Sequence, residues 1–165
     1  MLFLKKLCLV LSLCFLVPLC ACGKAGHQTY TLPPFSAVAS FSFQNSDYQA
    51  QVTYNSPDDM EVSMLEPSTL KGLVFQQKSA EATVRFAGVT IQADDLAVLP
   101  LPSPVPLLLL RLLAAVGAGP LSVGSDGRIT GALDDLTYEL QVDPETGFPL
   151  RLATDDFACT FVNKT

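Results

Sequence analysis

Apolar and polar residues alternate along much of residues 37–93, and this alternation restricts the fold more than any other feature of the sequence. Phe41 and Phe43 share one face of the chain in this pattern, and Val52 and Tyr54 share another. Side chains two residues apart on a strand point to the same side, so such a stretch buries one face and exposes the other. Short polar breaks interrupt the pattern at residues 45–47, 56–59, 66–68 and 78–79. The pattern predicts an antiparallel meander with one face inward.

The C-terminal third repeats this pattern. Residues 136–142 alternate, residues 143–147 (DPETG) have the composition of a turn, and apolar residues return from Phe148 to a last strand at 157–162. Earlier, residues 123–129 (VGSDGRI) predict a further hairpin, because Asp-Gly favours the positive φ angles of a tight turn.

One segment between these parts has a different pattern and predicts a helix at about 104–116. Ser103 can cap it, Pro104 suits its first position and Gly117 suits the position after its end. The run from 107 to 116 is apolar on nearly all sides, with Arg111 as the exception. Such a helix could be a membrane span, a helix in a filled core, or a helix that lines a cavity. Length and Arg111 argue against the span.

The expected fold is therefore mainly β (α+β): an antiparallel meander that forms a curved sheet or half-open barrel, with the apolar helix packed on or in its concave face. We expect a signal peptide at residues 1–21, a lipidated N-terminus and tether at 22–36, and a single β-rich domain at 37–165. The tether assignment rests on the polar stretch KAGHQTYTLPP.

The first 21 residues have the features of a secretory signal peptide. Lys5 and Lys6 precede a 13-residue, mainly apolar region at 7–19, and small residues follow. An uncleaved membrane anchor is the alternative, although a spanning helix needs about 20 apolar residues.

The tetrad Leu19-Cys20-Ala21-Cys22 resembles the lipobox of bacterial lipoproteins, and a poorer competing register ends at Cys20. The resemblance implies a thioether-linked diacylglyceride on Cys22 and cleavage before it. Two acyl chains hold a protein stably on a membrane. The resemblance thus predicts lipid attachment at Cys22, on the extracytoplasmic face of the cell membrane or on an outer membrane where one exists.

Charge argues against other modes of attachment. All 16 acidic residues but only 8 of the 10 basic ones follow residue 21, which leaves a net charge of −8. Such a surface repels phosphate groups, so we expect no nucleic-acid partner and no electrostatic attachment to a bilayer.

Residues that could support catalysis or metal binding are sparse. Cys159 is the single cysteine after Cys22 and is expected to be a buried strand residue; the single histidine, His27, lies on the predicted tether. Asp-Asp pairs at 58–59, 94–95, 134–135 and 155–156 fit strand ends, with calcium binding or paired-carboxylate catalysis as alternatives. No nucleophile elbow, phosphate-binding loop or zinc signature occurs, so we expect no enzyme, no metal and no cofactor.

The order of these elements, with the turn Asp143-Pro-Glu-Thr-Gly-Phe-Pro149, resembles the bacterial lipoprotein-carrier superfamily (LolA/LolB-like). In that family a half-open antiparallel barrel with helices in its mouth holds acyl chains. The resemblance implies a hydrophobic cavity for a lipid or the acyl part of a lipoprotein. The alternative is a cell-envelope protein-interaction module with a filled core, whose protein partner the sequence does not identify. The residues expected to contact an apolar ligand are Leu108, Arg111, Leu112, Phe43 and Phe86.

Overall fold

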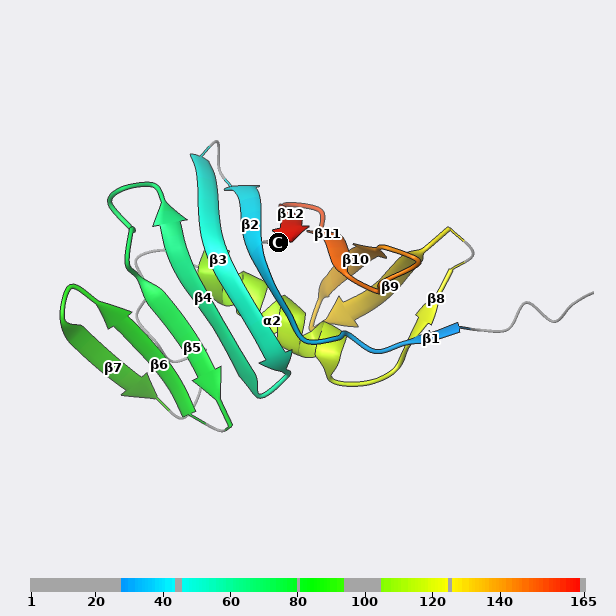
Figure 1. The fold of residues 1–165 in the computed structure, drawn as a ribbon, viewed down its shortest axis with the longest axis horizontal. Helices are drawn as coiled ribbons and strands as arrows, with labels where there is room; N and C mark the ends of the chain where they lie inside the picture. Colours follow the sequence, from blue (N-terminus) through cyan, green and yellow to red (C-terminus); the bar gives the residue numbers. More distant parts are fainter. Residues whose placement is uncertain (1–27, 44–45, 80, 94–104, 125, 164–165) are drawn as a thin grey trace, which may run out of the picture.

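The computed structural model describes residues 28–43, 46–79, 81–93, 105–124 and 126–163. These residues form strands and one helix, α2, in a mainly β arrangement (Figure 1). The elements are β1 (Gln28–Tyr30), β2 (Phe35–Phe43), β3 (Ser46–Ser56), β4 (Asp59–Glu66), β5 (Val74–Lys78), β6 (Glu81–Phe86), β7 (Val89–Ala93), α2 (Val105–Gly117), β8 (Leu121–Val123), β9 (Arg128–Leu133), β10 (Leu136–Val142), β11 (Pro149–Ala153) and β12 (Ala158–Asn163).

A ten-stranded antiparallel sheet has the order β7-β6-β5-β4-β3-β2-β12-β11-β10-β9. The last strand of the chain, β12, pairs with β2 and so joins the two halves of the sheet. The sheet is strongly curved but not closed into a barrel, and α2 crosses one of its faces, here called the inner face (Figure 1). This confirms the predicted curved antiparallel sheet with one packed helix.

The alternation in sequence becomes an alternation in burial. On β3, Ala50, Val52 and Tyr54 point to the inner face and are buried, while the residues between them are partly exposed. Their partners on β4 are Met64, Val62 and Met60 in the same order, and all are buried. Burying a side chain of this size contributes roughly 1.5–3 kcal/mol. The inner face therefore holds the hydrophobic core.

Two of the tight turns depend on positive φ angles. Ala87 (φ 49°) and Gly88 (φ 82°) connect β6 to β7 as a two-residue hairpin of the kind that matches strand twist. Asp134 (φ 52°) begins the turn between β9 and β10.

The predicted hairpin at residues 123–129 is only partly correct. Its turn exists, with Gly127 at φ 74° and a hydrogen bond from Gly124 N to the Arg128 carbonyl at 2.8 Å. The flanking strands do not pair with each other, however. β8 pairs with β1 in a separate two-stranded sheet, whereas β9 pairs with β10.

The helix α2 lies where the sequence predicts it, and its last residue differs from the predicted one by a single position. The predicted cap Ser103 and first residue Pro104 lie outside the described residues. Gly117 is the last helical residue rather than the residue after the helix. The Tyr54 hydroxyl and Pro57 occupy the space that a Cβ at Gly117 would need. Close packing therefore accounts for this glycine. No helix in the described part of the chain is long and apolar enough to span a membrane.

The stretch predicted as a tether contains β1, and β2 begins at Phe35. Leu32 is buried, and the Tyr30 hydroxyl donates a hydrogen bond to the Gly147 carbonyl at 2.8 Å. These contacts attach residues 28–34 to the folded body, so the ordered part of the chain begins earlier than residue 37. The predicted signal peptide and Cys22 lie outside the described residues.

Candidate ligand-binding surface

The middle of the inner face is filled by α2. Leu109, Leu112 and Leu113 are completely buried, and the helix contacts β4 and β9. Surface hollows of about 620, 410 and 270 Å³ are lined by described residues, and no α2 residue lines any of these three. Over the central strands these three leucines of α2 therefore belong to the hydrophobic core.

Beyond the helix the inner face stays apolar but becomes exposed. α2 runs toward β9 and away from β6 and β7, which form one end of the molecule (Figure 1). On these strands Phe86 is 39% exposed, Val89 60% and Ile91 41%. Phe86 pairs with Val89, and Ile91 pairs with the buried Val84, so all four lie on the same face as the core. We call Phe86, Val89 and Ile91 the apolar end patch.

The structure separates the five residues predicted to contact an apolar ligand. Leu108 and Arg111 lie on the outward side of α2, where Leu108 is partly buried, whereas Leu112 points into the core. Phe43 ends β2 and is partly buried, and Phe86 ends β6. Three strands stand between β2 and β6, which corresponds to roughly 19 Å at about 4.8 Å per strand. Phe86 alone among the five belongs to the apolar end patch.

Arg111 has a carboxylate partner. Its guanidinium donates to the Asp134 carboxylate at 2.6 Å, and both side chains are exposed. An exposed pair of this kind contributes only about 0–1 kcal/mol. Arg111 therefore joins α2 to the turn between β9 and β10.

Val89 and Ile91 were not identified from the sequence. The spacing Val89-x-Ile91 continues the alternation of β6 after a turn that contains Gly88. This signal is short, and it does not indicate whether a helix covers the strand. Which side chains of the inner face stay exposed can be determined only once the path of α2 is known.

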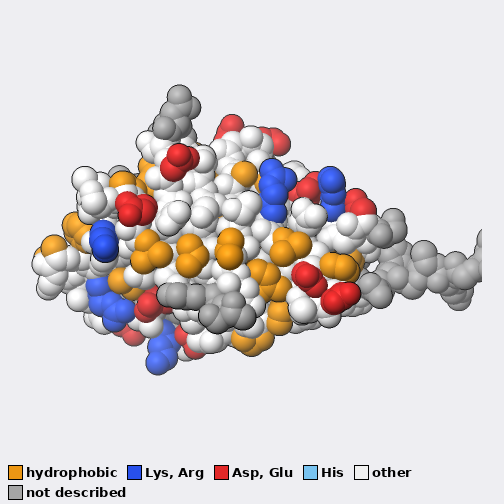
Figure 2. Space-filling view, turned by 45° about the horizontal axis from the view of Figure 1, so that its top comes forward, with side chains coloured by type: hydrophobic (Ala, Val, Ile, Leu, Met, Phe, Trp, Pro, Cys, Tyr) orange, Lys and Arg blue, Asp and Glu red, His pale blue; other side chains and the backbone are white. Residues whose placement is uncertain are grey.

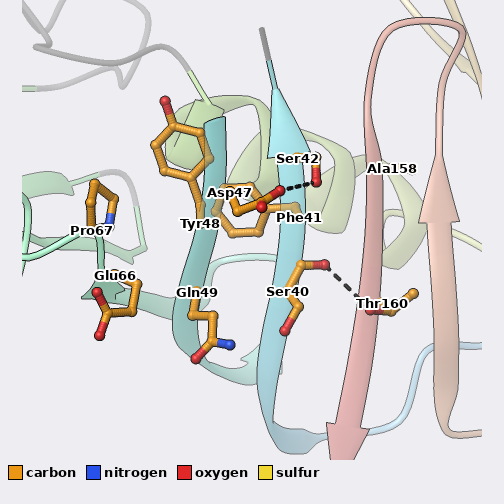
Figure 3. A pocket seen from close by; sticks show the side chains of 10 residues that line it. All are labelled: Ser40, Phe41, Ser42, Asp47, Tyr48, Gln49, Glu66, Pro67, Ala158 and Thr160. Atoms are coloured by element: carbon orange, nitrogen blue, oxygen red, sulfur yellow. Dashed lines mark hydrogen bonds between the residues drawn. The ribbon is translucent and has the colours of Figure 1, made fainter. Parts of the chain in front are cut away.

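A second candidate surface has both polar and apolar groups. The hollow of about 620 Å³ is formed by the ends of β2, β3, β4 and β12 and by Pro67, which follows β4 (Figure 3). Ser42 donates a hydrogen bond to the Asp47 carboxylate at 2.6 Å, and Thr160 donates one to the Ser40 carbonyl at 3.3 Å. Gln49 and Glu66 add polar groups, Phe41, Tyr48, Pro67 and Ala158 add apolar ones, and no basic side chain is among the lining residues.

The turn that motivated the family resemblance serves a structural purpose. The Asp143 carboxylate accepts hydrogen bonds from the backbone N–H groups of Thr146 and Glu145, both at 2.9 Å. These bonds favour the ionised form and hold the pKa of the exposed Asp143 below its usual value. Gly147 donates to the Asp143 carbonyl at 2.8 Å and has φ 71°. The residues of this motif are therefore accounted for by the turn itself.

Groups with catalytic or metal-binding potential remain dispersed. Within the described ranges no three His, Cys, Asp or Glu side chains converge on a common point. Asp134 and Asp135 form the turn between β9 and β10, and Asp155 and Asp156 form a bend after β11. Cys159 is buried, as expected, and burial raises the pKa of its thiol to about 12. The thiolate needed for nucleophilic chemistry is thus disfavoured there.

Charges of both signs are spread over the surface. In Figure 2 acidic and basic side chains both border a row of hydrophobic ones on the visible face. The ion pair of Arg85 with Glu61 at 3.2 Å connects β6 to β4 across β5. That of Arg128 with Glu139 at 3.5 Å links the neighbouring strands β9 and β10. The negative net charge is therefore not gathered into one acidic patch on this face.

Comparison with solved structures places the fold among known ones. A conserved protein from Thermus thermophilus, described as uncharacterized, is similar with a TM-score of 0.51 and 14% identity, over 80% of this chain and 77% of that one. A LolA superfamily protein from Nitrosomonas europaea gives a TM-score of 0.42 and 10% identity, over 81% and 86%. No protein-family model matches the sequence, and neither does any curated protein. The likeness to the Thermus protein shows that this fold recurs in a solved structure.

Proposed function

We propose that this protein is a lipid-anchored, extracytoplasmic binding protein that holds a lipid or acyl chain against the apolar end patch. The observation that carries the proposal is the exposure of Phe86, Val89 and Ile91 on the same face as the buried core. Covering this apolar surface would contribute about 25 cal/mol for each Å² removed from water. The proposal includes no catalytic step, no cofactor and no nucleic-acid partner.

The anchor part of the proposal rests on the sequence Leu19-Cys20-Ala21-Cys22. A diacylglyceride on Cys22 would provide attachment that the acidic body cannot provide through charge. Cys22→Ala is expected to move the full chain out of the membrane fraction or to leave it unprocessed. A variant that is cut normally and stays in the membrane contradicts the anchor.

The ligand part is tested on the full chain extracted from membranes in mild detergent. Organic solvent removes non-covalent lipid but leaves a thioether-linked lipid in place, so mass spectrometry of the extract reports non-covalent lipid only, and the difference between variants reports the lipid held at the patch. Phe86→Ser and Ile91→Ser are expected to lower the amount of extracted lipid. Val162→Ser is the matched control, because Val162 is 62% exposed but lies on β12 in the middle of the sheet. Equal lipid in all four samples, wild type included, contradicts the ligand.

A second candidate function is a protein-interaction module of the cell envelope. The filled core beneath α2, with Leu109, Leu112 and Leu113 completely buried, favours it. In this case the end patch would contact a protein instead of a lipid. Crosslinking in intact cells followed by mass spectrometry separates the two, since a protein partner would be lost from Phe86→Ser and retained by Val162→Ser.

A further inference from the structure

The strand β7 is an edge strand of the ten-stranded sheet. It stands last in the strand order and pairs with β6 on one side. Residues 87–92 are all exposed, and no described strand pairs with the other side of β7. Natural edge strands are usually protected by charged residues, proline or a bulge. The sequence Val-Thr-Ile-Gln-Ala of β7 contains no charge and no proline, and its register with β6 is regular.

The same strand is self-complementary. When two copies of β7 pair antiparallel about Ile91, Ile91 faces its own copy, Val89 faces Ala93, and Thr90 faces Gln92. Apolar positions then meet on the inner face and polar positions meet on the outer face. In a body with a net charge of −8, an uncharged strand is also the place where two copies can approach without like charges directly opposed.

We propose that β7 pairs antiparallel with β7 of a second copy of this chain on the membrane surface. Two strands of five residues bury less than the roughly 1,200 Å² of a standard stable interface, so the pair is weak in dilute solution. Anchoring both copies to one membrane raises their effective concentration. This step rests on the lipid anchor of the proposed function. β7 lies at the end of the molecule opposite to β1, so the anchored end does not obstruct it (Figure 1).

The pairing has a consequence for ligand binding. Antiparallel pairing continues the sheet with the same face inward, so Phe86, Val89 and Ile91 of both copies form one apolar surface. A surface twice as wide can hold a longer chain than either patch alone. Pairing therefore makes each copy a contributor to the ligand site of the other.

Cysteine crosslinking of the full chain in its membrane tests the pairing. Ile91→Cys is expected to give a covalent dimer of twice the monomer mass after mild oxidation, because directly opposed residues bring their Cβ atoms within about 5.5 Å. Val162→Cys is the exposed control and is expected to remain monomeric. Cys159 is buried and does not interfere. Thr90→Cys and Gln92→Cys are expected to crosslink to each other when co-expressed, more strongly than either does alone.

The outcomes separate the two proposals. Membrane recovery is measured in the same samples, and loss of the wild-type chain from the membrane contradicts the anchor. If the Ile91→Cys variant is fully recovered in the membrane but remains monomeric, the pairing is overturned and the anchor is not. The pairing is also overturned if Val162→Cys gives as much covalent dimer as Ile91→Cys, or if Ile91→Cys crosslinks to a different protein.

Discussion

At Gly117 the type of residue that fits is determined by a neighbour far away in the sequence. Gly117 ends α2, and the Tyr54 hydroxyl lies where its Cβ would be. Alanine gains up to about 1 kcal/mol in helix propensity, but it has to displace a buried tyrosine, which costs about 1–3 kcal/mol. Gly117→Ala is therefore expected to lower the free energy of unfolding in urea. Gly119→Ala, with open space around it, is expected to leave that energy unchanged or to raise it.

Asp143 is expected to make stability depend on pH. Two backbone N–H groups hold its native pKa below the ordinary value of 3.8, so the native state favours the ionised form. This contribution is fully present above pH 3.8 and is lost as pH falls through the lower native pKa. Asp143→Asn should therefore be less stable than wild type near neutral pH, and the difference should shrink in acid. Thermal unfolding across pH measures the difference.

Glu145→Gln is the control for this pH dependence. It removes a charge from the same turn but keeps the Glu145 backbone N–H that donates to Asp143. A stability difference for Asp143→Asn that stays constant with pH, or that Glu145→Gln reproduces, would contradict the assignment.

At the scale of elements, the sequence predicts the features that depend on a local pattern of residues. The alternation on β3 and β4 identified the buried faces, because Val52 and Val62 follow a period that a strand alone determines. The run from 107 to 116 indicates a covered helix for another local reason, since it is apolar on nearly all sides. β1 was missed, since three residues in a polar stretch carry no period, and its pairing with β8 depends on a partner about ninety residues later.

The candidate site was less predictable than the elements. Phe86 was identified as an apolar strand residue, but Leu112 on the helix has the same character and is completely buried. Which apolar residue stays exposed depends on where α2 crosses the sheet. The helix contacts β9, which follows it closely in the chain, and β4, which lies far before it. Sequence periodicity does not contain this information.

At the scale of the whole molecule, the two sheets differ in how they are held. The large sheet is continuous through the pairing of β2 with β12 and is packed on α2. The small sheet has only two strands of three residues each, and isolated two-stranded pairs are marginally stable in water. The Tyr30 hydroxyl, through its bond to the Gly147 carbonyl, connects this small sheet to the turn after β10. If Cys22 is the anchor, any pull from the membrane reaches the body through β1.

This arrangement predicts that the small sheet opens first. Tyr30→Phe removes one hydrogen bond worth about 1 kcal/mol, so hydrogen exchange in β1 and β8 is expected to rise roughly fivefold. Exchange in β3 and β4 is expected to stay unchanged, because these central strands open only with the whole domain. Tyr138→Phe is the control, since Tyr138 is also buried but its hydroxyl has no hydrogen bond among the described residues. A uniform rise across both sheets in Tyr30→Phe would mean that they unfold as one unit, and the anchor would then act on the whole body.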